Sequence, residues 1–252
     1  MPAGFGTRLG VRGVTPPPSA PTAWTATGRT AWYRDTYVLS GSSITRWDDI
    51  GGGGLHMPAP AGHEPTRVLS VVNGQPVARF ASASQQRLQG APGPTFAQFL
   101  STTGGRAYAV CGVTASSSGT RRTIWVDSSE YAWQQVVYFD ALHAMVYSGG
   151  AKTIYTGSGS VAGDTWYLLS WKFGGSPRRL HVRINNGPWV TSDTDIGDIG
   201  AITGRLVIGS NYNSTTDFFD GDIADLAFYD ADISDVDDAL NLEYARARYA
   251  LW

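Results

Sequence analysis

Short runs of residues that are apolar, or that alternate between apolar and polar, recur along most of the chain and predict β-strands. The clearest runs span residues 106–114, 123–126, 166–173, 180–184, 205–209 and 221–229. Another two runs, 67–72 and 76–80, flank Asn73-Gly74, a dipeptide typical of a two-residue hairpin turn. Polar and glycine-containing turns separate the runs, so the pattern predicts an all-β sandwich.

One segment near the C-terminus has helical spacing instead. Its apolar side chains recur every three or four residues, at Val236, Leu240, Tyr244 and Ala247. Ser234 is a suitable N-cap, and three aspartates in the next four positions suit the positive end of a helix dipole. We therefore expect a short helix, after which Tyr249 and Leu251 join Tyr244 in closing the sandwich.

Residues 133–147 predict a hairpin with two unlike faces. If Asp140-Ala141 is its turn, Phe139 pairs with Leu142 and Tyr138 with His143. One face is apolar and is expected in the core: Trp133, Val137, Phe139, Leu142, Ala144 and Val146. The other face carries the aromatic and polar groups that stack on sugar rings and bind hydroxyls, namely Gln134, Tyr138, His143 and Tyr147. These four are the candidate carbohydrate-binding residues; packing under a loop or against another subunit is the alternative.

Residues 1–30 differ from the rest, since glycines and the run Pro16 to Pro18 interrupt them and no apolar period is visible. They predict an extended arm that orders against a partner, or a disordered tail, joined to a domain spanning 31–252. Deleting the arm is expected to leave the sandwich folded. Residues 1–13 contain no apolar stretch of the kind found in secretory signals, so export by general secretion is not expected.

Composition excludes several classes of function. Charged residues make up only 16% of the chain and the net charge is −2, so no nucleic-acid partner is expected. No apolar run is long enough for membrane insertion. The single cysteine, Cys111, lies in an apolar run and is expected to be buried and inert. Whether the chain forms a homo-oligomer does not follow from the sequence, and a homo-oligomer stays possible.

Several segments taken together resemble a known superfamily. They are Ala31-Trp32-Tyr33, Trp47-Asp48-Asp49 with the glycines after it, Asn73 to Phe80, Arg205 to Gly209, and Phe219 to Asp225 followed by the helix and Tyr249-Ala250-Leu251. Their order resembles the laminin-G-like, concanavalin A-like lectin/glucanase superfamily, in the branch found in bacterial surface proteins and phage structural proteins. Asp225 stands where the family usually has Glu, and Ala250 where it usually has Gly. The resemblance covers residues 31–251 and implies a jelly-roll sandwich of two antiparallel sheets.

The same resemblance indicates which residues a catalytic member of the superfamily would need. Glycanases of the superfamily carry Glu-x-Asp-x-Glu on one strand, whereas Glu64, Glu130 and Glu243 belong to no such motif. Asp220 and Asp222 alternate around Gly221 and are interpreted as turn carboxylates. Lyases of this fold use Tyr and His, which leaves the pair Tyr138 and His143 as an alternative. We expect no enzyme.

No cofactor is assigned, although calcium is common in the superfamily. Two loops offer carboxylates for it, Asp193, Asp195 and Asp198 in one and Asp217, Asp220 and Asp222 in the other. Neither loop matches a defined calcium motif.

The sequence-based hypothesis is a non-enzymatic structural and adhesion protein on the surface of a phage or phage-like particle. It would be a head spike, decoration or tail fibre component that binds cell-surface polysaccharide of the host and contacts other virion proteins through its arm. The alternative is a bacterial carbohydrate-binding module of a surface or secreted protein, located extracellularly or at the cell surface. A glycanase or polysaccharide lyase is the third hypothesis.

Overall fold

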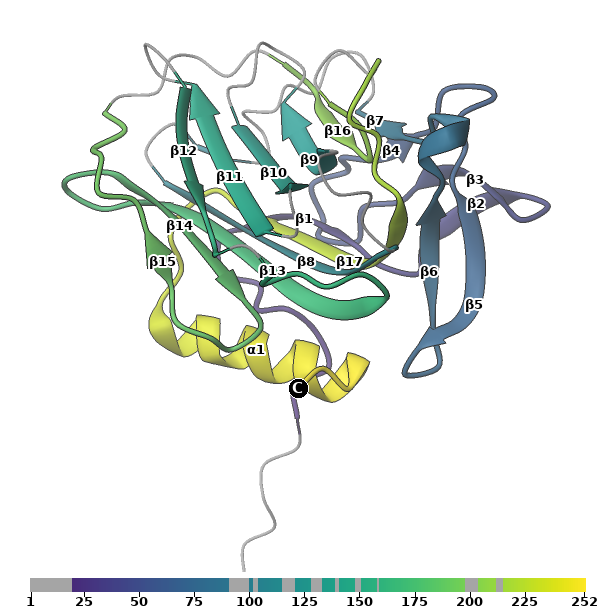
Figure 1. Ribbon diagram of the computed structural model, residues 1–252. Coiled ribbons are helices and arrows are strands. Elements are labelled where there is room, and N and C mark those ends of the chain that lie inside the picture. The colour runs from purple at the N-terminus through teal and green to yellow at the C-terminus, as the bar shows by residue number, and fades with distance from the viewer. Residues whose placement is uncertain are drawn as a thin grey trace, which may run out of the picture.

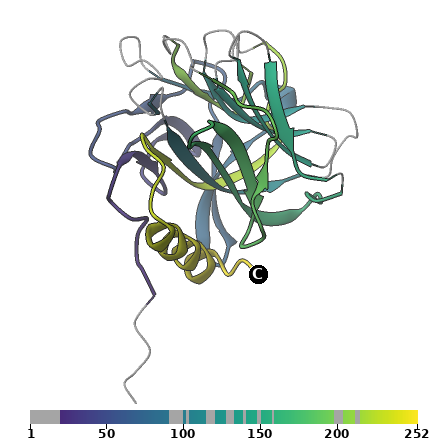
Figure 2. The same cartoon turned by 90° about the vertical axis from the view of Figure 1, so that its left-hand side faces the viewer.

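The computed structural model describes residues 20–90, 100–101, 104–114, 121–127, 133–138, 141–147, 151–157, 159–197, 204–211 and 215–252. The side chains of residues 133–138 and 147 lie outside this description. In the described part, two antiparallel sheets form a sandwich with one helix on its outside (Figures 1 and 2). The predicted all-β sandwich with a C-terminal helix is confirmed.

The larger sheet contains eleven of the described strands in the order β15-β14-β13-β8-β17-β6-β5-β3-β2, with β1 beside β17 and β4 beside β3. Its strands are β1 (Arg29–Tyr33), β2 (Tyr37–Ser40), β3 (Ser43–Trp47), β4 (Met57–Pro58), β5 (Thr66–Val72), β6 (Gln75–Phe80), β8 (Gly105–Val113), β13 (Thr165–Gly174), β14 (Arg179–Ile184), β15 (Val190–Thr191) and β17 (Gly221–Tyr229). A 3-10 turn, Ser82–Ser84, follows β6. β17 lies near the middle, pairing with β8 on one side and with β6 and then β1 on the other.

The smaller sheet contains six described strands in the order β12-β11-β10-β9-β16-β7. They are β7 (Leu88–Gln89), β9 (Arg122–Asp127), β10 (Trp133–Tyr138), β11 (Ala141–Tyr147), β12 (Ala151–Tyr155) and β16 (Leu206–Ile208). β12 is an outer strand of this sheet, and it follows β11 in the chain. The three strands β10, β11 and β12 therefore form a meander at one edge of the sandwich.

Large aromatic side chains fill the space between the sheets. Trp125 of β9 meets Trp171 of β13 and Phe228 of β17, with ring centroids 5.3 and 5.4 Å apart and the rings edge to face. All three are fully buried, and burial of such surface is the main source of stability in a sandwich. Cys111 lies in the same core, where burial raises the pKa of its thiol to about 12. The predicted buried cysteine is confirmed.

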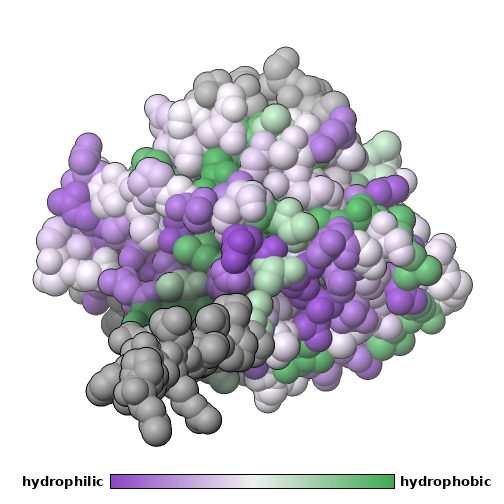
Figure 3. All heavy atoms as spheres, turned by 90° about the horizontal axis from the view of Figure 1, so that it is seen from below, coloured by the Kyte–Doolittle hydropathy of each residue, from purple (hydrophilic) through white to green (hydrophobic). Residues whose placement is uncertain are grey.

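Helix α1 (Asp235–Tyr249) covers the outer face of the larger sheet (Figures 1 and 2). Ser234 is its N-cap, as predicted, and its hydroxyl accepts a hydrogen bond of 3.1 Å from the backbone nitrogen of Asp237. Seen from this side, polar and apolar side chains are interspersed over the surface (Figure 3). Among the described residues, no helix is long and apolar enough to cross a membrane.

The buried side of α1 differs from the expected one. Tyr244 is buried as predicted, but Val236 is 71% exposed and Leu240 43% exposed, while Asp238 and Asn241 are buried. The physical reason lies in the sheet, whose outer face presents polar groups that need partners.

Asp238 is the partner of two buried arginines. Its carboxylate accepts two hydrogen bonds from Arg183, at 2.7 and 2.8 Å, and one of 2.6 Å from the hydroxyl of Tyr108. Arg106 forms an ion pair with the same carboxylate at 2.9 Å. Burial opposes the charge of Asp238, but the hydrogen bonds from Arg183 and Tyr108 and the two cations outweigh it, so the pKa of Asp238 lies below its ordinary value.

Trp24, which belongs to the predicted arm, packs against the sandwich and α1. Its side chain is 2% exposed, stacks on Tyr108 at 5.0 Å and contacts Tyr244 at 4.7 Å. Its indole Nε1 donates to Asp225 at 2.9 Å. The expectation that residues 1–30 lack packing is therefore wrong for Trp24, because its partners lie on strands and a helix distant in the sequence. Residues 1–19 lie outside the described part, and the domain boundary at residue 30 stays a prediction.

Asp225 is the common acceptor beneath the helix. One of its oxygens accepts from the indoles of Trp24 and Trp32, at 2.9 and 2.8 Å, and the other from the hydroxyls of Tyr244 and Tyr249, at 2.8 and 2.7 Å. Complete burial raises the pKa of this carboxyl, and the four hydrogen bonds only partly offset that effect. Asp225 thus ties the N-terminal segment, β1 and the C-terminal half of the helix, including its last residue, to β17.

Candidate functional site

The outer face of β10, β11 and β12 contains the candidate site. On β11, Leu142, Ala144 and Val146 are fully buried and belong to the core, as predicted. His143 and Met145 alternate with them and are only half-buried, so they lie on the opposite, outer face. The two-faced character of this strand is confirmed.

The register of the hairpin differs from the prediction by two residues. Val137 pairs with Leu142, and Tyr138 pairs with Ala141 rather than with His143. Val136 therefore lies directly opposite His143, and residues 139–140 lie outside the described residues. A shift of two residues preserves the faces, because side chains alternate with a period of two. The direct cross-strand pair of Tyr138 and His143, on which the lyase alternative depended, is wrong.

Of the four candidate residues, the structure describes the side chain of His143. Gln134, Tyr138 and Tyr147 belong to β10 and β11, and the register places their backbone positions on the same outer face as His143. Their side chains lie outside the described residues, so their part in the site stays a prediction.

Tyr155 is a residue of this face that the sequence reasoning missed. It is 60% exposed on β12, pairs with His143 across the β11–β12 ladder and stacks on its imidazole, with ring centroids 5.1 Å apart and planes at 18°. The available signal was the run of β-branched and aromatic residues Thr153-Ile154-Tyr155 shortly after Gly149-Gly150, a composition typical of a strand that follows a turn. The stacked pair presents an aromatic surface to solvent.

Backbone contacts hold this pair in position. The five register pairs between β11 and β12 run without a shift, from His143 opposite Tyr155 to Tyr147 opposite Ala151. Directly after Tyr155, the hydroxyl of Thr156 accepts a hydrogen bond of 2.9 Å from the nitrogen of Leu142. The end of β12 is thus fixed to the start of β11, which orients the aromatic pair without any ligand.

The carboxylates considered for catalysis or calcium are bound by arginines instead. Arg79 forms a bidentate pair with Asp222 at 2.7 and 2.8 Å, and Arg121 lies 3.7 Å from Asp217. Asp220 accepts a hydrogen bond of 3.2 Å from the nitrogen of Ser82. Within the described ranges, no group of three or more His, Cys, Asp or Glu side chains could hold a metal ion.

The remaining acidic candidates are scattered. Asp193 and Asp195 are exposed, and Asp195 accepts a hydrogen bond of 2.9 Å from the nitrogen of Gly197. Glu243 lies on α1 in a salt bridge with Arg246, at 2.8 Å. Asp198 and Glu130 lie outside the described residues.

No protein-family model and no curated protein matches the sequence of the chain. Among solved structures, the binding domain of Paraclostridial Mosquitocidal Protein 1 aligns with a TM-score of 0.64 at 9% identity, over 88% of this chain and 53% of that one. The binding domain of Botulinum neurotoxin serotype D gives a TM-score of 0.62 at 10% identity, over 88% and 51%. The binding domain of Botulinum neurotoxin DC in complex with SialylT gives 0.59 at 10%, over 89% and 52%.

The chain thus spans about half the length of the structures that it matches. At such low identity, the likeness extends to the fold and no further. It bears out the fold implied by the sequence resemblance: the chain is an antiparallel β-sandwich with the concanavalin A-like lectin fold.

Proposed function

We propose that the chain is a non-enzymatic lectin-like domain that binds carbohydrate through the outer face of β10, β11 and β12. The exposed pair of Tyr155 and His143 is the observation that carries this proposal. A pyranose ring stacks on an aromatic face through its C–H groups, and a neighbouring imidazole can donate to or accept from its hydroxyls. A large exposed tyrosine, oriented by its neighbours, suits this task.

Two comparisons support a sugar ligand. The matched domain of Botulinum neurotoxin DC is in complex with SialylT, and cell entry of the matched type C toxin depends on two ganglioside molecules. The matched structures are binding domains of larger proteins, which favours the alternative hypothesis of a carbohydrate-binding module over a particle component. No comparison speaks for a phage particle, and the location of the protein stays a prediction.

A glycan array with the parent protein and Tyr155→Ala tests the proposal. Stacking on one tyrosine contributes about 1 kcal/mol, so the variant should bind its glycan up to about tenfold more weakly. Trp252→Ala is the matched control, because Trp252 is an aromatic residue of similar size that is 43% exposed and lies beyond α1. It should bind like the parent.

Three results would contradict the proposal. They are the absence of any glycan binding by the parent, equal binding by the parent and Tyr155→Ala, and equal weakening by Tyr155→Ala and Trp252→Ala. Incubation with the glycans that bind addresses the enzyme hypothesis, because only a glycanase or lyase would shorten the chains.

A further inference from the structure

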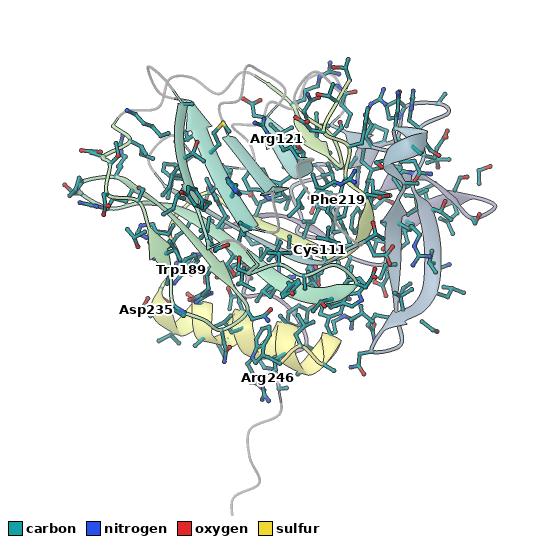
Figure 4. All side chains as sticks on the ribbon, viewed as in Figure 1. Cys111, Arg121, Trp189, Phe219, Asp235 and Arg246 are labelled. Atoms are coloured by element: carbon teal, nitrogen blue, oxygen red, sulfur yellow. The ribbon has the colours of Figure 1, made fainter. Side chains whose placement is uncertain are left out.

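The outer face of the larger sheet carries a second group of polar and aromatic side chains, which are buried or half-buried and lie on the other sheet from Tyr155. At the β15 edge, the register places His181 of β14, Lys172 of β13 and Arg106 of β8 in one row across three strands. Arg183 lies two residues further along β14 on the same face. This is the side of the sheet that α1 covers (Figure 4).

Trp189, in the turn between β14 and β15, folds back over this row (Figure 4). Its ring centroid lies 4.2 Å from the guanidinium carbon of Arg183, 5.0 Å from the ammonium of Lys172 and 5.3 Å from the guanidinium carbon of Arg106. The imidazole of His181 meets its edge, with centroids 6.3 Å apart. Trp189 itself is half-buried, so part of the indole faces solvent.

The terminal nitrogens of the two arginines bind protein groups, whereas the Nε of each is buried without a hydrogen-bond partner in the described part of the chain. Arg183 donates twice to Asp238, and Arg106 donates to Asp232 at 2.6 Å besides its ion pair with Asp238. Both guanidinium groups are almost fully buried and serve the attachment of α1. The cation–π contacts of these two arginines account for the position of Trp189, but neither arginine accounts for the presence of Lys172 beside them.

The ammonium of Lys172 has fewer protein partners than the two guanidinium groups. Within the described chain its ammonium has one anionic neighbour, the carboxylate of Asp232 at 3.6 Å, and it donates no hydrogen bond. Its side chain is 17% exposed, and the Asp232 carboxylate, 41% exposed, already accepts from Arg106. With the arginines included, three cations face two carboxylates, which leaves one positive charge in excess. An ammonium has three donors, so Lys172 has capacity for an anion from solution.

Two further groups beside Lys172 have free hydrogen-bonding capacity. His181 uses Nδ1 with the hydroxyl of Thr191 at 2.9 Å, and its Nε2 meets no described partner. Burial, and then the charge of Lys172, lowers the pKa of His181 to about 4, so the ring is neutral at physiological pH. The indole nitrogen of Trp189 likewise donates to no group in the described ranges. An aromatic ring, an ammonium, a neutral imidazole and an indole N–H thus meet at one surface corner.

We propose that Trp189, Lys172 and His181 form a second binding site, for a saccharide that carries a carboxylate. The sugar ring stacks on the solvent-facing part of Trp189, its carboxylate accepts from the ammonium of Lys172, and a hydroxyl bonds to Nε2 of His181. The site is independent of the Tyr155 face, since it lies on the other sheet, and it goes beyond the proposed function by naming an acidic ligand.

Titration followed by NMR of the indole N–H signals tests the proposal. Trp189→Phe identifies the signal of Trp189 among those of the nine tryptophans. The probes are trigalacturonate and 3′-sialyllactose, with lactose as the neutral probe and sodium acetate as the free anion. We expect at least one acidic saccharide to shift the Trp189 signal and to bind Lys172→Met at least tenfold more weakly, which is about 1.4 kcal/mol.

A second variant separates a ligand site from a structural cluster. Asp232→Asn removes the carboxylate that competes for Lys172, while Arg106 keeps Asp238. It should therefore bind the acidic saccharide more tightly than the parent, a gain that no purely structural role predicts. Tyr155→Ala should leave this binding unchanged, so failure of the first site and failure of this one are distinguishable.

The proposal is overturned by any of four results. The first is that neither acidic saccharide shifts the Trp189 signal, and the second is that lactose binds as tightly as 3′-sialyllactose. The third is that acetate alone displaces the saccharide at equal concentration. The fourth is that folded Lys172→Met and folded Asp232→Asn bind the saccharide like the parent. Thermal melting of each variant shows whether it is folded. Lys172→Met keeps most of the buried stem, so it provides the test even if Trp189→Phe unfolds.

Discussion

Trp24→Ala should destabilise the domain severely, although residue 24 precedes all of the strands that the structure describes. The substitution empties a site in which the indole is 2% exposed and contacts the rings of Tyr108 and Tyr244. Truncating a buried aromatic residue to alanine costs about 3–5 kcal/mol. The lost hydrogen bond also leaves Asp225 with three of its four donors, and such a bond to a charged group contributes about 1.5–3 kcal/mol. Because the two effects overlap, we expect a total of about 4–6 kcal/mol.

Trp24→Phe separates the two contributions, because it keeps a buried ring and removes the Nε1 donor. Its expected cost is about 1.5–3 kcal/mol. The control is Trp252→Ala, whose exposed ring should contribute within about 0.5 kcal/mol. Equilibrium unfolding in guanidinium chloride, followed by far-UV circular dichroism, measures all three without depending on tryptophan fluorescence.

A Trp24→Ala variant within about 1 kcal/mol of the parent would refute this reasoning. It would mean that the segment before β1 is peripheral to stability, as the composition of residues 1–30 alone suggests. A cost for Trp24→Phe equal to that for Trp24→Ala would instead place the whole effect in the hydrogen bond to Asp225.

Three further predictions concern the rest of the fold. Because the pKa of Asp238 is lowered in the folded state, its carboxylate contributes stability above the unfolded pKa of about 3.9, and this stability is lost as the pH falls through the lower folded pKa. Asp238→Asn should therefore cost about 3–5 kcal/mol of unfolding free energy at pH 7 and should reduce the loss of stability at acid pH. An unchanged acid dependence would exclude Asp238 as its source. Gly221→Ala should lower the free energy of unfolding by at least about 3 kcal/mol, because φ is +154° and a Cβ would lie 2.2 Å from the carbonyl oxygen of Gly112. The control Gly157→Ala, which has open space around the added Cβ, should melt like the parent. Cys111, whose thiol pKa is raised to about 12, should react with a thiol reagent only after unfolding, and rapid reaction of the native protein would contradict its burial.

Alternation along the chain is sufficient to identify most strands, because it reports directly which face of a strand is buried. It placed β8, β13 and β14 and the hairpin around Asn73-Gly74, where both turn residues have positive φ. It could not fix the register of β10 against β11, since the sequence between the two strands has no Asn-Gly or similar turn signature and a shift of two residues leaves both faces unchanged.

Long-range polar contacts account for what the sequence pattern missed. Asp238 is buried because Arg183 and Tyr108, 55 and 130 residues away, supply its donors, and no local period reports that. The same holds for Trp24, whose acceptor Asp225 is 201 residues distant. In the candidate site, the face of His143 was predictable, whereas Tyr155 required the pairing of β12 with β11.

The place of β17 in the sheet has a consequence for synthesis of the protein on the ribosome. β8, β6 and β1 emerge well before it, yet each of them pairs with β17. Until residues 221–229 leave the exit tunnel, these strands have unsatisfied edges, which are the surfaces that pair wrongly with other chains. The larger sheet must therefore close late, after β8 and β6 have each waited with one unpaired edge and β1 has waited without its partner strand. Stalled or prematurely terminated chains that end before residue 221 should accordingly be prone to aggregation.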